Sequence, residues 1–269
     1  MGERTRLGVL GWPVAHSLSP AIQNAALRAA GLAGWRYQLL PLAPELFGET
    51  VPALAAAGLR GANVTIPHKR AAVALAHAAS PRARAIGAAN TLLLGRDGSI
   101  AADNTDAPAL IAAIPFGLRG ATALVLGAGG SARAAVWALL DAGAAEVRVW
   151  NRTPARAREL CDELGGTAVQ RASGAAEVLV NCTAVGLDGH GAGLEALPVD
   201  PARLGAYELV IDLVYKRQGT DLIAAARSQG VACVDGLELL VGQGALSFEQ
   251  FTGARAPLGA MRAAVGLPE

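Results

Sequence analysis

One of the two lysines in the chain ends the segment Asn63-Val64-Thr65-Ile66-Pro67-His68-Lys69, and every other basic side chain except Lys216 is arginine. A lysine ammonium can release and regain a proton, whereas an arginine guanidinium stays charged. Because arginine supplies plain positive charge elsewhere in this chain, we interpret Lys69 as a candidate proton donor. The alternative is an ordinary surface lysine at the start of a helix.

Two further segments, Gly87-Ala88-Ala89-Asn90-Thr91 and Asp103-Asn104-Thr105-Asp106, place amide, hydroxyl and carboxylate groups at the ends of short apolar runs. Strand ends are where α/β sheets carry their ligand sites. Such a set can donate to and accept from several hydroxyl groups, which suits a polyhydroxylated ligand. Ordinary turn and cap chemistry explains any one of these residues equally well.

The composition excludes several classes of protein. The chain has 269 residues, is 52% hydrophobic and 17% charged, and carries a net charge of +1 without a basic cluster. We therefore expect a compact protein of two domains with a small-molecule substrate and without nucleic-acid or membrane partners. The sequence leaves a monomer and a homodimer open. Three scattered cysteines predict free thiols and a cytoplasmic location, and dispersed histidines give no metal site. Pro13 interrupts the only N-terminal run that resembles a signal peptide.

Apolar runs alternate with alanine-rich helical stretches along the whole chain, which is typical of an α/β fold. Early strands are expected at Leu7–Gly11, Arg36–Leu40 and Ala62–Ile66, with Pro67 as the first residue of the next helix and Lys69 in its first turn. Gly95-Arg96-Asp97-Gly98 predicts a hairpin between strands at 88–94 and 99–102. A helix is expected after Asp106.

A nucleotide-binding unit is expected to follow. An apolar strand at 121–126 leads into Gly127-Ala128-Gly129-Gly130-Ser131-Ala132, which fits the G-x-G-x-x-A pattern before a helix. In this pattern one glycine permits the turn, another admits a pyrophosphate, and the helix N-terminus offers free N–H groups. A purely structural glycine turn is the alternative.

The residues after the next strand, Glu146–Trp150, predict the type of dinucleotide. An NAD site usually has a carboxylate there to bind the ribose 2′-hydroxyl. This chain instead has Asn151-Arg152-Thr153 with Arg156 one turn later. A guanidinium suits a 2′-phosphate, so we predict NADP as the cofactor. A solvated arginine beside a helix cap at Thr153 is the alternative.

The remaining strands are expected at 177–181, 208–214 and 231–234, with a helix at 221–229. Thr183 and the segment Asp212-Leu213-Val214-Tyr215 follow two of these strands and are expected to line the nicotinamide side of a cleft. The apolar helix expected at Leu237–Phe251 carries Gln243 and should pack back onto the first domain.

Taken together, these motifs resemble the shikimate dehydrogenase (shikimate/quinate dehydrogenase) family over the whole chain. The matching segments are Ser17-x-Ser19, Asn63 to Lys69, Ala89-Asn90-Thr91, Asn104-Thr105-Asp106, Gly127-Ala128-Gly129-Gly130, Asn151-Arg152-Thr153, Asp212-x-Val214-Tyr215 and Gly242-Gln243. The resemblance implies reversible NADPH-dependent reduction of 3-dehydroshikimate to shikimate, on the route to chorismate and the aromatic amino acids.

The resemblance also implies two domains and a set of site residues. Residues 1–105 and 238–269 would form a substrate-binding domain with a mixed, mainly parallel sheet, and residues 106–237 a Rossmann-type NADP-binding domain. Lys69 and Asp106 match the catalytic pair. The residues matching substrate contacts are Ser17, Ser19, Asn63, Thr65, Asn90, Tyr215 and Gln243. The expected cofactor contacts are Gly127, Gly129, Gly130, Ser131, Ala132, Asn151, Arg152, Thr153, Arg156, Thr183, Leu213 and Gly236.

The chain departs from the family pattern at three positions, where it has Ala109 in place of a usual glycine, Arg217 in place of a frequent proline and Leu239 in place of a frequent methionine. Two alternatives remain open. The first is a quinate/shikimate dehydrogenase, against which Ser19 counts because quinate users tend to have threonine there. The second is a non-catalytic NADP-binding regulator with the same fold, against which Lys69 and Asp106 count.

Overall fold

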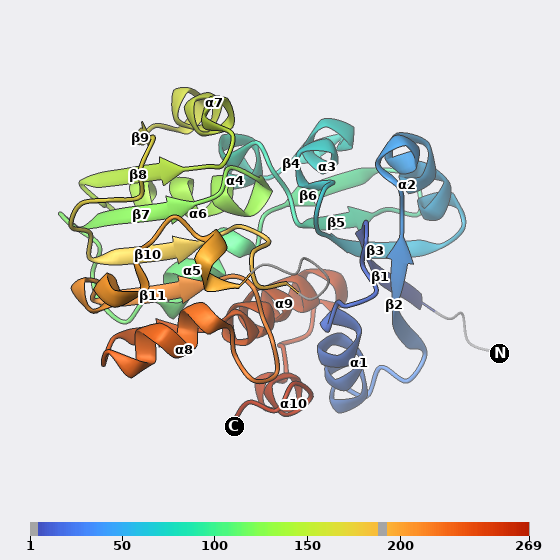
Figure 1. Cartoon of the computed structure of the whole chain (residues 1–269). Coiled ribbons are helices and arrows are strands. Elements are labelled where there is room, and N and C mark those ends of the chain that lie inside the picture. Colours follow the sequence, from blue (N-terminus) through green and yellow to red (C-terminus); the bar gives the residue numbers. More distant parts are fainter. Residues whose placement is uncertain (1–4, 188–192, 269) are drawn as a thin grey trace. The chain divides into compact units, whose positions relative to one another are not determined.

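The protein divides into two compact units in this computed structural model, which describes residues 5–187 and 193–268. The first unit comprises Met1–Thr105 together with Val241–Glu269, and the second comprises Asp106–Leu240. Each unit is built on its own sheet (Figure 1). The prediction of an α/β fold with one mixed and one parallel sheet is confirmed.

The first unit has a six-stranded sheet in the order β2-β1-β3-β5-β6-β4. Strands β1, β2 and β3 pair in parallel, β3, β5 and β6 pair antiparallel, and β4 pairs in parallel with β6. The strands are β1 (Thr5–Gly11), β2 (Trp35–Pro41), β3 (Leu59–Val64), β4 (Ala78–Ala79), β5 (Thr91–Leu94) and β6 (Ile100–Asp103). The helices are α1 (Ser19–Ala29), α2 (Phe47–Ala56), α3 (Lys69–Leu75), α4 (Pro81–Ile86), α10 (Leu258–Ala263) and the later part of α9 (Gly236–Thr252). A 3₁₀ turn at Pro44–Leu46 precedes α2.

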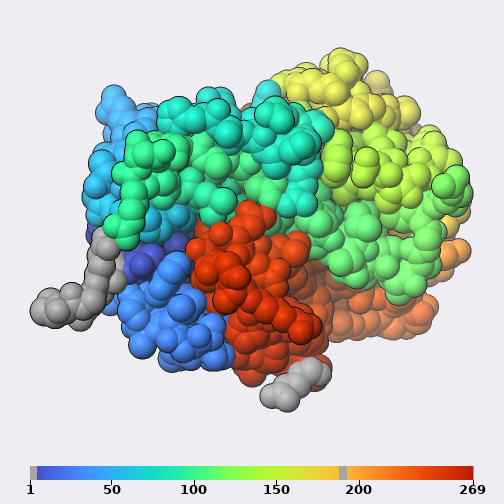
Figure 2. All heavy atoms as spheres, turned by 180° about the vertical axis from the view of Figure 1, so that it is seen from behind, coloured from blue at the N-terminus to red at the C-terminus, as the bar shows by residue number. Residues whose placement is uncertain are grey.

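The C-terminal segment of the first unit packs against its N-terminal elements. Figure 2 shows the red C-terminal segment lying against the blue N-terminal one. The buried Gln23 side chain of α1 donates to the Gly244 carbonyl of α9 at 2.9 Å, and α1 also packs on α10. Residues more than two hundred positions apart therefore form one core.

The second unit has an all-parallel six-stranded sheet in the order β12-β11-β10-β7-β8-β9. This is the doubly wound order of dinucleotide-binding folds, with its switch point between β7 and β10. The strands are β7 (Thr122–Leu126), β8 (Glu146–Trp150), β9 (Thr167–Val169), β10 (Val178–Asn181), β11 (Leu209–Asp212) and β12 (Ala232–Val234). The helices are α5 (Asp106–Ala113), α6 (Gly130–Asp141), α7 (Pro154–Leu164), α8 (Asp221–Ser228) and the start of α9, with 3₁₀ turns at Leu194–Ala196 and Pro201–Ala206.

Both faces of the parallel sheet are covered, as its continuous apolar strands require. In β7, Ala123 and Val125 face a core formed with α5, α6 and α7, whereas Leu124 and Leu126 face a second core formed with α8. This alternation follows from the two-residue period of a strand. Because helices cover both faces of this sheet, a ligand can reach it only at the ends of its strands.

Several predicted boundaries near the candidate site were wrong. Strand β3 ends at Val64 rather than Ile66, and β5 begins at Thr91 rather than Ala88. Pro67 is not the first helical residue, because the His68 amide closes a turn onto the Thr65 carbonyl at 2.9 Å and α3 begins at Lys69. Lys69 nevertheless lies in the first helical turn, as predicted. The hairpin is confirmed by the pairing of Leu94 with Ile100.

Among the described residues, none of the helices combines the length and apolar character needed to cross a bilayer.

Candidate active site

Lys69 is placed by the turn that precedes α3. Its side chain is only 8% exposed, and its carbonyl accepts the Ala89 amide at 2.8 Å. The neighbouring His68 is buried, stacks on Phe47 with ring centroids 4.6 Å apart, and has its Nε2 2.8 Å from the Leu42 carbonyl. Burial lowers the pKa of His68, and this hydrogen bond opposes the shift. The histidine therefore anchors the helix start in the core and leaves Lys69 at the next position.

A buried cluster of polar side chains lies where β3 and β6 end and β5 begins. Asn63 is its first member and uses both ends of its amide. Its Oδ1 accepts from the Tyr37 hydroxyl at 2.8 Å and from the Ser247 hydroxyl at 3.4 Å. Its Nδ2 donates to the Asn90 carbonyl at 3.2 Å. Asn63 is thus a buried connection between two strands and helix α9, as well as a candidate ligand group.

Asn90 is the centre of the same cluster. Its Oδ1 accepts the Thr105 amide at 2.7 Å and the Thr91 hydroxyl at 3.1 Å, and its Nδ2 donates to the Thr105 hydroxyl at 2.9 Å. Nδ2 also lies 3.3 Å from Oε1 of Gln243 on α9. The structure therefore brings Asn63, Asn90 and Gln243 into one hydrogen-bonded group, as the sequence prediction required.

The remaining substrate candidates of the first unit lie just after β3 and at the start of α1. Thr65 follows β3 and is half-buried, with its amide donating to the Leu10 carbonyl at 2.9 Å. Ser17 precedes α1, and its hydroxyl accepts the Ser19 amide at 3.3 Å and lies 3.2 Å from the Ser19 hydroxyl. This contact on its own also fits an ordinary turn at the start of the helix before Pro20.

Sequence reasoning missed Tyr37 and Ser247, which bond Asn63, and it named Asp103 in the segment 103–106 without giving it a role. Ser247 could have been found from its position one helical turn after Gln243. Tyr37 lies on β2 and Asp103 ends β6, and neither position follows from local spacing alone.

The second unit carries the glycine turn at its switch point. Gly127 has φ of +108°, and a Cβ on it would lie 3.0 Å from the Cys182 carbonyl oxygen. Gly129 caps α6 with open space around it, and Gly130 and Ser131 begin the helix. Ala132 is fully buried, as the third position of the pattern requires for close packing. These features fit a pyrophosphate approaching the start of α6.

The loop between β8 and α7 presents the arginines. Arg152, Thr153 and Arg156 are exposed, and Asn151 Nδ2 donates to the Thr153 carbonyl at 2.9 Å. Thr153 is the N-cap of α7, but its side chain makes no capping hydrogen bond. Arg152 in this loop and Arg156 in the first turn of α7 therefore offer two exposed guanidinium groups, and residues 151–156 include no carboxylate, which fits a 2′-phosphate.

A buried carboxylate organises the ends of β10 and β11. Asp212 is 1% exposed and accepts from Asn181 Nδ2 at 2.9 Å, Thr220 Oγ1 at 2.6 Å and the Val214 amide at 3.0 Å. Burial raises the pKa of Asp212 to about 6 against the opposing effect of these hydrogen bonds. Asn181 Oδ1 in turn accepts the Thr183 amide at 3.0 Å.

The other predicted site residues of the second unit lie at the ends of its strands and the starts of its helices. Leu213 and Tyr215 follow β11 and are half-buried, and Gly236 is the buried first residue of α9. Asp106 is the half-buried first residue of α5. Of the departures from the family pattern, Ala109 and Leu239 are buried and Arg217 is exposed. The described residues contain no group of three or more histidine, cysteine or acidic side chains that could hold a metal ion.

A doubly wound parallel sheet with a G-x-G-x-x-A turn, in a chain whose other unit carries a buried lysine and a polar cluster, defines a two-domain α/β protein of the dinucleotide-binding class. Family models match three segments of the chain. Residues 9–92 match the shikimate dehydrogenase substrate-binding domain, residues 110–185 match shikimate/quinate 5-dehydrogenase, and residues 236–265 match the shikimate 5′-dehydrogenase C-terminal domain.

Similarity to individual proteins extends over nearly the full length. The chain is 44% identical to the shikimate dehydrogenase (NADP(+)) of Anaeromyxobacter sp. (strain K), covering 95% of this chain and 94% of that protein. It is 40% identical to the shikimate 5-dehydrogenase of Thermus thermophilus, solved in complex with NADP(H) and shikimate, with a TM-score of 0.83 over 97% of this chain and 98% of that one. The chain belongs to the shikimate dehydrogenase family.

The same fold also occurs with a different activity. The 5-ketofructose reductase of a Gluconobacter strain is 27% identical, with a TM-score of 0.83 over 98% of this chain and 99% of that one. The fold alone therefore does not define the substrate.

Proposed function

We propose that the chain is an NADP-dependent shikimate dehydrogenase that reversibly reduces 3-dehydroshikimate to shikimate in the biosynthesis of chorismate and aromatic amino acids. The observation that carries this proposal is the full-length similarity, at 40% identity, to a dehydrogenase solved with both NADP(H) and shikimate. The 44% identity to a curated shikimate dehydrogenase (NADP(+)) supports the same assignment.

The two units contribute differently in this proposal. The first unit, with its polar cluster, supplies most of the proposed substrate contacts, and the second, with its glycine turn, supplies the proposed NADP contacts together with Asp106 and Tyr215. Ser17 and Ser19 hold the substrate carboxylate with help from Tyr215. The ring hydroxyls are held by Asn63, Thr65, Asn90, Asp106 and Gln243. The buried amides of Asn63 and Asn90 support this role, because their internal hydrogen bonds fix the side chains before a ligand arrives.

NADPH, when bound, would supply the hydride for the reduction and NADP+ would accept it in the reverse direction; the proposed contacts are the twelve residues predicted above, from Gly127 to Gly236. Arg152 and Arg156 bind the 2′-phosphate in this assignment. A charge-assisted hydrogen bond is worth about 1.5–3 kcal/mol, which corresponds to about one to two decades of affinity. The lack of a carboxylate among residues 151–156 supports NADP over NAD.

Lys69 is the proposed proton donor. When the substrate carbonyl carbon gains hydride, its oxygen becomes an alkoxide and must gain a proton to give the alcohol. Lys69 donates this proton, and in the reverse direction its neutral amine accepts it. Asp106 is the second member of the proposed catalytic pair and binds a substrate hydroxyl. The neighbouring His68 supports this role because its buried contacts fix the backbone at Lys69, and a proton donor needs a fixed position relative to its acceptor.

A cytoplasmic location is part of the proposal, supported by the three free cysteines, Cys161, Cys182 and Cys233. We propose a monomer or homodimer as the working assembly.

A spectrophotometric assay of shikimate-dependent NADP reduction tests the function. We expect turnover with shikimate and NADP, and kcat/KM for NAD at least tenfold lower. Quinate in place of shikimate tests for a quinate/shikimate dehydrogenase, and NADPH-dependent reduction of 5-ketofructose tests for the activity of the Gluconobacter relative. A preference for quinate, for NAD or for 5-ketofructose would contradict the proposal, and no turnover with any pair would favour a non-catalytic NADP-binding regulator.

A further inference from the structure

We propose that Asp103 is a positioning residue for the substrate-binding cluster, holding Asn104-Thr105 and the Gln243-bearing helix α9 in the geometry that binds the substrate hydroxyls. This inference rests on the proposed function, because it assigns a role within the same site. Asp103 is the last residue of β6 and has no direct role in the reaction described above.

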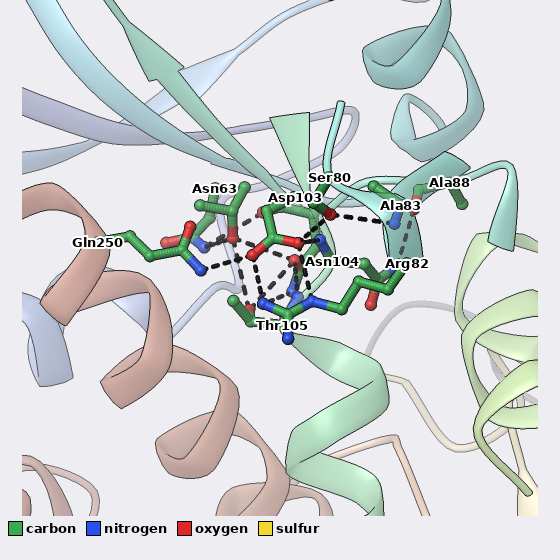
Figure 3. A network of polar contacts seen from close by, with 11 residues as sticks. Asn63, Ser80, Arg82, Ala83, Ala88, Asp103, Asn104, Thr105 and Gln250 are labelled. Atoms are coloured by element: carbon green, nitrogen blue, oxygen red, sulfur yellow. Dashed lines mark hydrogen bonds and ion pairs between the residues drawn. The ribbon is translucent and has the colours of Figure 1, made fainter. Parts of the chain in front are cut away.

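The carboxylate of Asp103 is the meeting point of three segments (Figure 3). Oδ1 accepts from Arg82 Nε at 2.8 Å, from the Asn104 amide at 2.8 Å and from the Ser80 hydroxyl. Oδ2 accepts from Gln250 Nε2 at 2.6 Å and from the second guanidinium nitrogen of Arg82. In Figure 3, Gln250 and Arg82 approach the carboxylate from opposite sides.

The charge of Asp103 is well compensated. Burial would raise the pKa of this carboxyl, but the hydrogen bonds from Arg82, Ser80 and Asn104 outweigh it and hold the pKa below its usual range. Arg82 binds the carboxylate with two nitrogens, which fixes the orientation as well as the charge. A carboxylate can serve this many donors at once because it accepts hydrogen bonds at both oxygens and donates none.

The contact with Asn104 connects Asp103 to the substrate-binding residues. The Asp103 carboxylate accepts a hydrogen bond from the Asn104 amide. The backbone carbonyl of Asp103 accepts a hydrogen bond from the Asn90 amide at 3.1 Å. Asn104 Nδ2 is held in turn by the Ala88 carbonyl at 2.9 Å. Asp103 thus bonds Asn90 directly and bonds Asn104, the residue before Thr105. The Thr105 amide in turn donates to Asn90 Oδ1.

The contact with Gln250 connects Asp103 to α9. Gln250 lies seven residues, about two turns, after Gln243, so both side chains lie on the same face of the helix. Gln243 lies within hydrogen-bond distance of Asn90. A sliding or rotation of α9 that moved Gln243 relative to Asn90 would also disrupt the hydrogen bond from Gln250 to Asp103, so this bond opposes such a movement.

Three single variants test this role in the full-length enzyme. Asp103→Asn keeps the shape but removes the charge and replaces one acceptor oxygen by a donor. Gln250→Met keeps the helix and removes the Asp103 contact alone, since Gln250 Oε1 has no hydrogen-bond partner within the described part of the chain. Asp97→Asn is the matched control, because Asp97 is an exposed carboxylate at the other end of the same hairpin, where it accepts from the amide and hydroxyl of Ser99.

The measurements are kcat, KM for shikimate, KM for NADP and the melting temperature of each variant, relative to wild type. We expect Asp103→Asn to lower kcat/KM for shikimate at least tenfold and Gln250→Met to lower it at least threefold. KM for NADP should change less than twofold in both, and Asp97→Asn should match wild type. A stabilising role alone would lower the melting temperature and leave the kinetics, measured well below it, unchanged.

The outcomes separate the two proposals. If both variants fall within twofold of wild type in kcat/KM for shikimate, or if KM for NADP rises as much as KM for shikimate, the positioning role is wrong. If Asp103→Asn does not fold, Gln250→Met decides alone by the same criteria. Failure of the proposed function would appear in the wild-type enzyme as absent turnover with shikimate, and the positioning role would fall with it.

Discussion

Lys69 is a buried lysine at the start of a helix, in a chain whose other basic side chains are all arginine except Lys216. Its side-chain type is therefore unusual for this chain. A lysine serving only as a charge could be replaced by arginine, whereas a proton donor could not. The distinction between charge and proton transfer can therefore be measured with two substitutions at one position.

We expect Lys69→Ala and Lys69→Arg both to lower kcat by about 10²–10⁴, the usual contribution of a positioned acid, with a smaller change in KM for shikimate. Steady-state kinetics in both directions would measure this. Arg70→Met, on the exposed neighbour in α3, is the control and should retain wild-type kcat. Wild-type kcat in Lys69→Arg would limit Lys69 to an electrostatic role.

Asp212 predicts a pH dependence of stability. Its pKa in the folded protein is about 6, above the value near 4 of a free aspartate. As the pH rises from about 4 to about 6, the unfolded state loses its proton first, so the wild-type protein loses about 3 kcal/mol of unfolding free energy through this group. The Asp212→Asn variant does not lose this free energy of unfolding, because asparagine does not ionise.

Denaturant unfolding of wild type and Asp212→Asn between pH 4 and 7 measures the difference. We expect the free energy of unfolding of the variant to rise relative to wild type across this range and to level off above pH 6 to 7. Other carboxylates cancel in the comparison, because both proteins carry them. Parallel curves for the two proteins would show that folding does not raise the pKa of Asp212.

At the scale of elements, helix α9 packs closely against strand β3. A Cβ added to Gly61 of β3 would lie 2.5 Å from the Phe251 ring of α9. The glycine thus lets the helix lie directly on the strand that ends in Asn63. This approach explains how Ser247 and Gln243 reach the polar cluster from the C-terminal end of the chain.

We expect Gly61→Ala to destabilise the protein by about 1–3 kcal/mol, the usual cost of overpacking, and to raise KM for shikimate because α9 must shift. Thermal unfolding and kinetics on the same preparation would measure both effects. Gly48→Ala is the matched control, since Gly48 lies in α2 with open space around it and alanine favours a helix. A Gly61→Ala variant as stable as Gly48→Ala would show that α9 does not pack this closely.

Sequence patterns predicted the elements of the second unit better than those around Lys69. The strand Glu146–Trp150 has its predicted bounds, because apolar alternation and the following turn residues are local signals. The ends of β3 and β5 were misplaced because Thr65, Ala89 and Asn90 bond across to Leu10, Lys69 and Asp103 instead of continuing a strand ladder. Such partners depend on strand order, which no local pattern encodes.

At the scale of the whole molecule, the chain consists of two compact units, the first assembled from both ends of the sequence. The proposal gives most of the substrate contacts to the first unit and the NADP contacts to the second. Ligand binding suppresses local opening around its own site, so the two ligands should protect different segments from hydrogen exchange.

We expect shikimate to slow amide exchange in residues 63–69, 90–91 and 241–250, and NADP to slow it in residues 127–133 and 151–156. Hydrogen–deuterium exchange with each ligand alone would measure this. NAD at the same concentration is the control and should protect residues 151–156 less. Protection of residues 127–156 by shikimate alone would contradict the division of roles.

The sequence was sufficient for the α/β class and the glycine turn, and it supplied the prediction of NADP and the candidate site residues. These rest on local chemistry, since turn residues, strand periodicity and a lysine in a helix start are readable within a few positions. The folded chain alone shows how those residues are held. Ser247 reaches Asn63 across 184 residues and Gln250 reaches Asp103 across 147, because sheet order and helix packing place them together. Spacing along a chain carries no record of such contacts, since they depend on how separate elements pack.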